Sequence, residues 1–172
     1  MPAWSPEIAN LFIRLGAKEN RTFDQMQLQK LVYIAHGWCL AIKGEPLTGD
    51  RPEAWVFGPV YRRLADALAS YGKQPVKTEI GAKFIYPNLT AAHAAAAIKS
   101  DLEDVPGDLI ARIYTEYGRF KASQLSTLTR RGSTPWKEIF ADGNGQFRDI
   151  PHRLIKAHFV RLSRPGDNPD HP

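Results

Sequence analysis

Cysteine is nearly absent from this sequence of 172 residues, and the single thiol belongs to Cys39. One cysteine cannot form an intramolecular disulfide, so a secreted disulfide scaffold is excluded and a reducing compartment such as the cytoplasm is expected. Long hydrophobic runs are missing too, since no apolar stretch approaches the roughly 20 residues that a membrane helix needs. The first residues also lack the basic start and apolar core of a secretory signal. We therefore expect a cytoplasmic protein that does not enter a membrane.

Catalytic and cofactor-binding motifs are missing as well. The sequence contains neither a glycine-rich phosphate loop nor the G-x-S-x-G turn of hydrolases, and it has no H-E-x-x-H helix. A single cysteine cannot build a zinc ribbon, and Cys39 falls on an apolar helical face, which favours a core role over a nucleophile. No catalytic residue, cofactor or metal ligand is therefore predicted. A hydrolase stays an open alternative if the fold joins His36 to a carboxylate and a nucleophile.

Acidic residues are scarce in the C-terminal third of the chain. Residues 1–111 contain 12 basic and 12 acidic residues, whereas residues 112–164 contain 11 basic and only 4 acidic ones. Such an asymmetry can mark a surface for an acidic partner, although long basic side chains can also simply solubilise amphipathic helices. We predict from this asymmetry a partner-binding surface in the last third. Its predicted members are Arg119, Lys121, Arg130, Arg131 and Lys137.

Aromatic residues are interleaved with these basic ones, a pattern that is also typical of nucleic-acid-binding surfaces. Tyr114 and Tyr117, however, share an apolar helical face with Ile110 and Ile113, which favours a core role for both rings. A nucleic-acid-binding regulator that uses the basic third is therefore the alternative hypothesis. The interleaved aromatic residues are Tyr114, Tyr117, Phe120, Trp136 and Phe147.

Helical periodicity dominates the chain. The strongest pattern covers residues 24–43, where apolar side chains occupy most of the helix circumference, so this helix should lie at the centre of the fold. Thr22 and Gln25 predict its capping box, and Gly44 predicts its left-handed end. The sequence therefore predicts a mainly α, single compact helical domain over residues 1–163, with a long buried central helix and at most a small β element. Residues 164–172, with three prolines, are predicted to form a disordered tail.

The possible β element falls near residues 53–60. Residues 53–57 are compatible with either a short strand or a last turn before Gly58, and Pro59 is expected in the first turn of the helix that follows. Residues 84–86 are compatible with a second short strand that pairs near Val56. Trp55 is expected to anchor the turn in the core. Further helices are predicted over residues 5–16, 90–100, 109–117, 122–129 and 151–162, with Thr134, Pro135 and Trp136 opening one more turn.

Gly37 interrupts the predicted central helix. Glycine inside a helix costs about 1 kcal/mol relative to alanine. A second helix that crosses closely at this position would offset that cost, because the missing side chain lets two helices approach. We therefore expect such a crossing at Gly37.

Three segments of the chain carry distinctive residue patterns. Residues 28–38 read LQKLVYIAHGW, residues 53–60 read EAWVFGPV, and residues 125–129 read LSTLT and precede Pro135-Trp136. In this order the segments resemble motifs of the Panacea domain family, a bacterial and phage-associated family that includes SocA-like antitoxins. The family's motifs are an L-x-K-L-x-Y-x-A-x-G-W helix, an A-W-x-x-G-P-V stretch, and an L-x-x-L-T-H segment followed by P-W. Arg130 stands where the family often has histidine.

The resemblance implies an antitoxin that neutralises a cognate toxin protein by direct contact. It also implies that such a domain can act as a proteolytic adaptor, which delivers the bound toxin to an AAA+ protease such as ClpXP. The matching residues resemble a fold signature more than a catalytic one, because glycine and proline suit turns and tryptophan suits a core. The signature residues are Gln29, Lys30, Tyr33, Gly37, Trp38, Trp55, Gly58, Pro59, Pro135 and Trp136.

Overall fold

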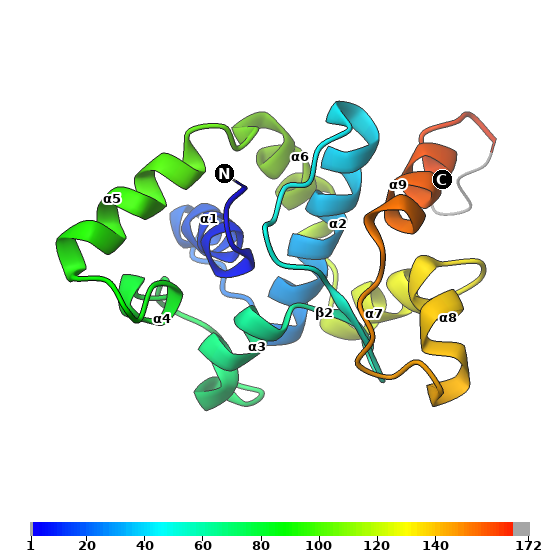
Figure 1. Ribbon diagram of the computed structural model, residues 1–172, viewed down its shortest axis with the longest axis horizontal. Helices are drawn as coiled ribbons and strands as arrows, with labels where there is room; N and C mark the ends of the chain where they lie inside the picture. Colours follow the sequence, from blue (N-terminus) through cyan, green and yellow to red (C-terminus); the bar gives the residue numbers. More distant parts are fainter. Residues whose placement is uncertain (1, 167–172) are drawn as a thin grey trace.

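The computed structural model describes residues 2–166, and this part of the chain is mainly α, as predicted (Figure 1). Within this range, no helix combines the length and the apolar character needed to cross a bilayer. Of the predicted tail, residues 167–172 lie outside the described residues. In chain order the elements are α1 (Ser5–Lys18), α2 (Gln25–Lys43), β1 (Glu53–Trp55), β2 (Gly58–Val60), α3 (Arg62–Leu68), the 3-10 helix η1 (Ala69–Tyr71), α4 (Ala82–Ile85), α5 (Ala91–Leu102), α6 (Gly107–Tyr117), α7 (Ala122–Arg130), α8 (Pro135–Phe140), the 3-10 helix η2 (Ala141–Gly143) and α9 (His152–Leu162).

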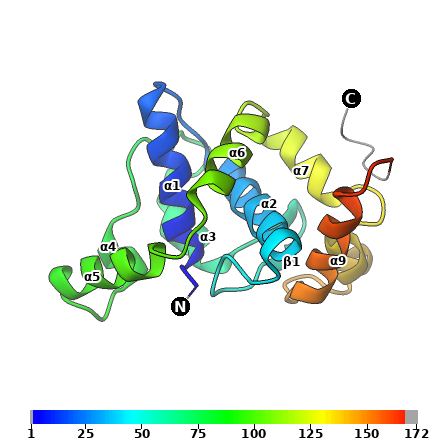
Figure 2. The ribbon, with the colours of Figure 1, turned by 90° about the horizontal axis from the view of Figure 1, so that it is seen from above.

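The central position predicted for the long helix is confirmed. Helix α2 contacts α1, α6, α7 and α9 as well as β2 and α3, and residues 28–37 are all buried. In Figure 1, α1 and α5 lie to one side of α2 while α8 and α9 lie to the other, and Figure 2 shows α6 and α7 along its remaining flank. A helix that is apolar on most of its circumference requires neighbours on most sides, and the fold supplies them.

The start of α2 differs from the prediction, whereas its end agrees. Asp24, rather than Thr22, caps the helix: its Oδ1 accepts a hydrogen bond from the backbone N–H of Gln27 at 2.8 Å, and the Gln27 side chain accepts from the Asp24 N–H. The reason is tertiary, because Phe23 is buried and its carbonyl accepts from the N–H of Val76 in a bridge that keeps the chain extended. Gly44 ends the helix in the left-handed conformation.

The β element is a small antiparallel hairpin in which Glu53 lies opposite Val60. Of the two alternatives for residues 53–57, the strand is the one present, over Glu53–Trp55. The prediction for Pro59 was wrong, since Pro59 lies in β2 and α3 begins only at Arg62. Gly58 turns the chain with a φ of +112°, a conformation that glycine adopts readily. The β1 strand has a second neighbour, because the Ala54 N–H donates to the Arg148 carbonyl at 2.8 Å.

The possible second strand at residues 84–86 is also wrong. This segment forms the end of the short helix α4, with Ile85 buried and the Tyr86 hydroxyl hydrogen-bonded to Asp101 of α5. Sheet pairing near Val56 is not available to it, because β1 already lies between β2 and residues 148–150. The second edge of β1, which residues 84–86 were expected to use, is thus occupied by residues 148–150 from the C-terminal part of the chain.

The close helix crossing expected at Gly37 is present between α2 and α9. The ring of Phe159 occupies the space beside the glycine, so that a Cβ added there would lie 2.2 Å from the Phe159 Cε2 atom. Phe159 itself is buried, and its ring also meets those of Tyr33 and Trp38 edge-on. A glycine at this position therefore allows α9 to seat an aromatic side chain against the central helix.

Replacing Gly37 with leucine should lower the free energy of unfolding by about 1–3 kcal/mol or more, because overpacking a filled core forces side chains and backbone to move. Gly107 is the matched control, since it is also helical and nothing lies within 4 Å of an added Cβ. Gly107→Ala should leave the stability unchanged or raise it by about 0.4–1 kcal/mol. Urea denaturation followed by circular dichroism measures both, and a Gly37→Leu curve that overlays the wild type would contradict this account of the crossing.

Candidate protein-interaction site

Side chains of α2 hold the hairpin in place. The Lys30 Nζ donates a hydrogen bond to the Pro59 carbonyl at 2.8 Å. Beside it, the Gln29 side chain donates to the Tyr61 carbonyl at 3.0 Å and accepts from the Tyr61 N–H at 2.8 Å. All four residues are buried. The polar signature residues Gln29 and Lys30 thus bind backbone groups of the second strand, which is a positioning role.

The third signature segment closes on the same hairpin from α7. The Ser126 hydroxyl donates to the Phe57 carbonyl at 2.6 Å, and Thr129 packs against Gly58. A Cβ on Gly58 would lie 2.9 Å from the Thr129 Oγ1 and 3.1 Å from the Lys30 side chain, so the hairpin, α2 and α7 meet where only glycine fits. Segments separated by about a hundred residues in the chain are therefore joined at one point.

Lys30 is an unusual residue for this position because its side chain is fully buried. Burial, together with the nearby Arg130 guanidinium, lowers the pKa of Lys30 to about 7. Among the described residues, no carboxylate forms an ion pair with it. The ammonium is therefore stabilised in the fold mainly by the Pro59 carbonyl.

The lowered pKa of Lys30 predicts a pH dependence of stability. Between pH 7 and the ordinary lysine pKa near 10.5, the unfolded chain holds a proton that folded Lys30 has released. The free energy of unfolding should therefore rise with pH across this window through Lys30, and Lys30→Met should remove that rise. Chemical denaturation of both proteins from pH 7 to 10.5 measures the difference. Parallel pH profiles would show that Lys30 titrates normally.

Helix α8 is attached to the other strand of the hairpin. Thr134 caps the helix by accepting from the Lys137 N–H, and Pro135 follows at the first helical position, as predicted. The Trp136 Nε1 then donates to the Trp55 carbonyl at 2.6 Å. Arg130 lies at the same corner, with its guanidinium 6.0 Å from the centre of the Trp136 ring and its Nε donating to the Ser126 carbonyl.

Trp55 is not the core anchor that was expected. Its side chain is only partly buried, and its ring forms a cluster with the exposed Phe147 ring, 5.3 Å away, and the Arg62 guanidinium, 5.2 Å away. Glu53 explains this arrangement, because its carboxylate accepts hydrogen bonds from both Arg62 and the Trp55 Nε1. The alternation of side chains along a strand places Ala54 in the core and its two neighbours on the opposite face, where both are partly buried.

The five predicted partner-binding residues occupy different environments. Arg119 and Lys121 are exposed in the turn between α6 and α7, and Lys137 is exposed on α8. Arg131 is exposed just after α7. Arg130, by contrast, is partly buried in the corner with Trp136, so part of its role is structural.

The aromatic residues of the basic third also differ in burial. Tyr114 is buried, in agreement with the core role that its helical face favoured, and its hydroxyl donates to the Glu19 carboxylate. Tyr117 is half-buried.

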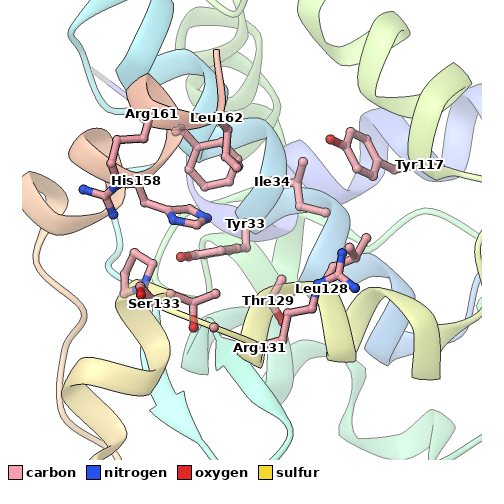
Figure 3. Close-up of a pocket in the computed structure, with 14 residues that line it drawn as sticks. Tyr33, Ile34, Tyr117, Leu128, Thr129, Arg131, Ser133, His158, Arg161 and Leu162 are labelled. Atoms are coloured by element: carbon pink, nitrogen blue, oxygen red, sulfur yellow. The ribbon is translucent and has the colours of Figure 1, made fainter. Parts of the chain in front are cut away.

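A hollow of about 630 Å³ opens between α7 and α9 over the buried face of α2 (Figure 3). Tyr33 and Ile34 contribute to its floor, and the loop that joins α7 to α8 forms one side. A second hollow of about 450 Å³ adjoins the other flank of α7 and shares Tyr117, Leu128 and Arg131 with the first. The sequence missed the α9 contribution, because charge and periodicity do not reveal which face of α9 borders α7. The first hollow is lined by Tyr33, Ile34, Tyr117, Leu128, Thr129, Arg131, Gly132, Ser133, Thr134, Pro135, His158, Phe159, Arg161 and Leu162.

His36, on which the hydrolase alternative depends, is fully buried beside α9 rather than in either hollow. Its ring lies 4.8 Å from that of His152, and its Nδ1 lies 3.1 Å from the Thr48 hydroxyl. Burial, with a smaller effect from His152, lowers the pKa of His36 to about 3, so the imidazole is neutral at physiological pH. Across residues 2–166, no group of three or more histidine, cysteine or acidic side chains is arranged to hold a metal ion.

The three signature segments together build one arrangement, in which a buried lysine holds the hairpin and helices α2, α7 and α8 surround it. Residues 28–137 match the family described as "Antitoxin SocA-like, Panacea domain", and the chain belongs to this family. It is similar to the protein named Antitoxin SocA of Caulobacter vibrioides (strain NA1000 / CB15N), with 32% identity over 138 residues that cover 80% of this chain and 70% of that relative. No solved structure matches the chain. The resemblance drawn from the sequence is confirmed, and family membership supports an antitoxin role.

Proposed function

We propose that this chain is an antitoxin that binds a cognate toxin protein directly and neutralises it, using the basic C-terminal third as its contact surface. The observation that carries this proposal is the distribution of roles among the signature residues. Lys30, Gly58 and Trp136 are occupied in holding helices to the hairpin, which leaves surface contact rather than chemistry as the means of action. The two hollows beside α7 supply a surface with the shape for such a contact.

The charge of this surface supports an acidic toxin face. Opposite charges across an interface speed the encounter of two proteins and select against wrong partners, while desolvated apolar contacts supply most of the affinity. Of the predicted basic residues, Arg130 is the least suited to a surface test, because a carboxylate in its place would face the Ser126 carbonyl in a partly buried corner. Arg119, Lys121 and Lys137 are exposed and test the charge alone.

The combined variant Arg119→Glu, Lys121→Glu, Lys137→Glu should weaken binding to the toxin at least tenfold, mainly through a slower association rate. The toxin probe is the purified product of the reading frame beside the gene for this chain, first shown to co-purify with the wild type. Lys73→Glu, Lys77→Glu, Lys99→Glu is the matched control, since it makes the same change in net charge at exposed positions outside the basic third. Equal loss in both variants would mean that net charge alone matters and would contradict a defined basic surface.

Masking and delivery are two routes to neutralisation. In the first, the antitoxin covers the working surface of the toxin; in the second, it acts as an adaptor and presents the toxin to an AAA+ protease such as ClpXP. The half-life of the toxin in growing cells separates them, because masking leaves the toxin abundant while delivery depletes it only when the protease is present. We favour masking as the minimal mechanism, since the hollows beside α7 provide one contact surface and masking needs no second.

The alternative of a nucleic-acid-binding regulator has the same basic third in its favour. It requires an affinity for a random DNA duplex whose logarithm falls linearly with the logarithm of salt concentration. A salt titration of duplex binding by the wild type and by the triple variant described above measures this affinity. If the wild type binds the duplex, the triple variant does not, and neither binds the neighbouring protein, the nucleic-acid-binding hypothesis would replace the antitoxin proposal.

A further inference from the structure

The two hollows beside α7 adjoin each other at Leu128, and together they are called the groove below. Both are lined by Tyr117, Leu128 and Arg131, so the half-buried Leu128 side chain lies where the two hollows meet. Leu128 lines the first hollow together with Ile34 and Tyr117 (Figure 3). Because the hollows of about 630 and 450 Å³ adjoin each other, one extended segment of a partner can place side chains in both.

The interior of the groove is largely apolar. Phe159 and Leu162 of α9 line the first hollow together with Ile34 of α2, and the half-buried Phe120 lines the second. Apolar surface that stays in contact with water is unfavourable, and burying it against apolar side chains of a partner releases that water. An occupant with large apolar side chains therefore gains most from this groove.

Within residues 2–166, the charged side chains that line the groove carry only one sign. No aspartate or glutamate of this range lines either hollow, whereas Arg131 borders both and Arg161 borders the first. Arg119 lies beyond the second hollow, with its guanidinium 5.5 Å from the centre of the Phe120 ring. A basic rim around an apolar interior is complementary to a segment that carries both acidic and apolar side chains.

We infer that this groove binds an acidic, apolar-bearing segment of the toxin. Large apolar side chains of the segment enter the hollows on the two sides of Leu128, and its carboxylates pair with the arginines at the rim. This inference rests on the proposed function, because it names the part of the partner that the antitoxin recognises. It adds Leu128 and Arg161, which the charge pattern alone did not select, to the binding residues.

Arg161→Glu and Arg153→Glu make a matched pair for testing the rim. Both residues are exposed on α9 and both changes alter the net charge equally, but only Arg161 lines the groove. Arg161→Glu should weaken binding of the purified neighbouring toxin at least tenfold, with the loss shrinking at high salt, whereas Arg153→Glu should bind like the wild type. Thermal melts should be unchanged for both, since neither side chain is buried.

The interior is tested at Leu128. Leu128→Gln should weaken toxin binding at least tenfold, and a photo-crosslinking benzoylphenylalanine at this position should attach to a toxin peptide that contains acidic and large apolar residues. If Arg161→Glu and Leu128→Gln both bind the toxin as tightly as the wild type, the groove is not the binding site, although the antitoxin proposal stands. Crosslinking to a basic peptide would also overturn the inference. If the wild type itself does not bind the toxin, the proposed function fails and this inference fails with it.

Discussion

The attachment of the small hairpin to helix α2 is the contact on which the rest of this fold depends. A two-stranded hairpin is marginal in water by itself. Here it is held by buried side chains, of which Lys30 binds the Pro59 carbonyl and Gln29 binds both backbone groups of Tyr61. Buried polar side chains are costly unless they are hydrogen-bonded, so these bonds specify one position of the hairpin on the helix.

The same hairpin then determines where the proposed partner-binding face lies. Helix α7 reaches it through Ser126 and the close packing at Gly58, while α8 reaches it through the hydrogen bond from Trp136 to the Trp55 carbonyl. The loop between α7 and α8, which forms one side of the larger hollow, is thereby fixed at both ends. A groove built on supported helices is preorganised, so little ordering is needed when a partner binds.

Under the proposed function, the residues that maintain the fold differ from those that meet the partner. Among the residues that carry the family resemblance, Lys30, Gly58 and Trp136 join helices to the hairpin, and exchanging them would affect folding. Arg161 is exposed, so it can change with little effect on stability while altering charge complementarity.

Helical periodicity determined the class of fold, the central place of α2 and the close approach at Gly37, because these follow from which side chains must leave water and how much space a glycine leaves. Local sequence failed where a distant segment decided the outcome. Residues 148–150 occupied the strand edge that residues 84–86 were expected to use, and the Phe23–Val76 bridge moved the start of α2 to Asp24. Charge along the chain indicated the basic third, but only the packing of α9 on α2 brought Arg161 and Leu128 into the lining of the same hollow, since a contact between segments far apart in sequence leaves no local pattern.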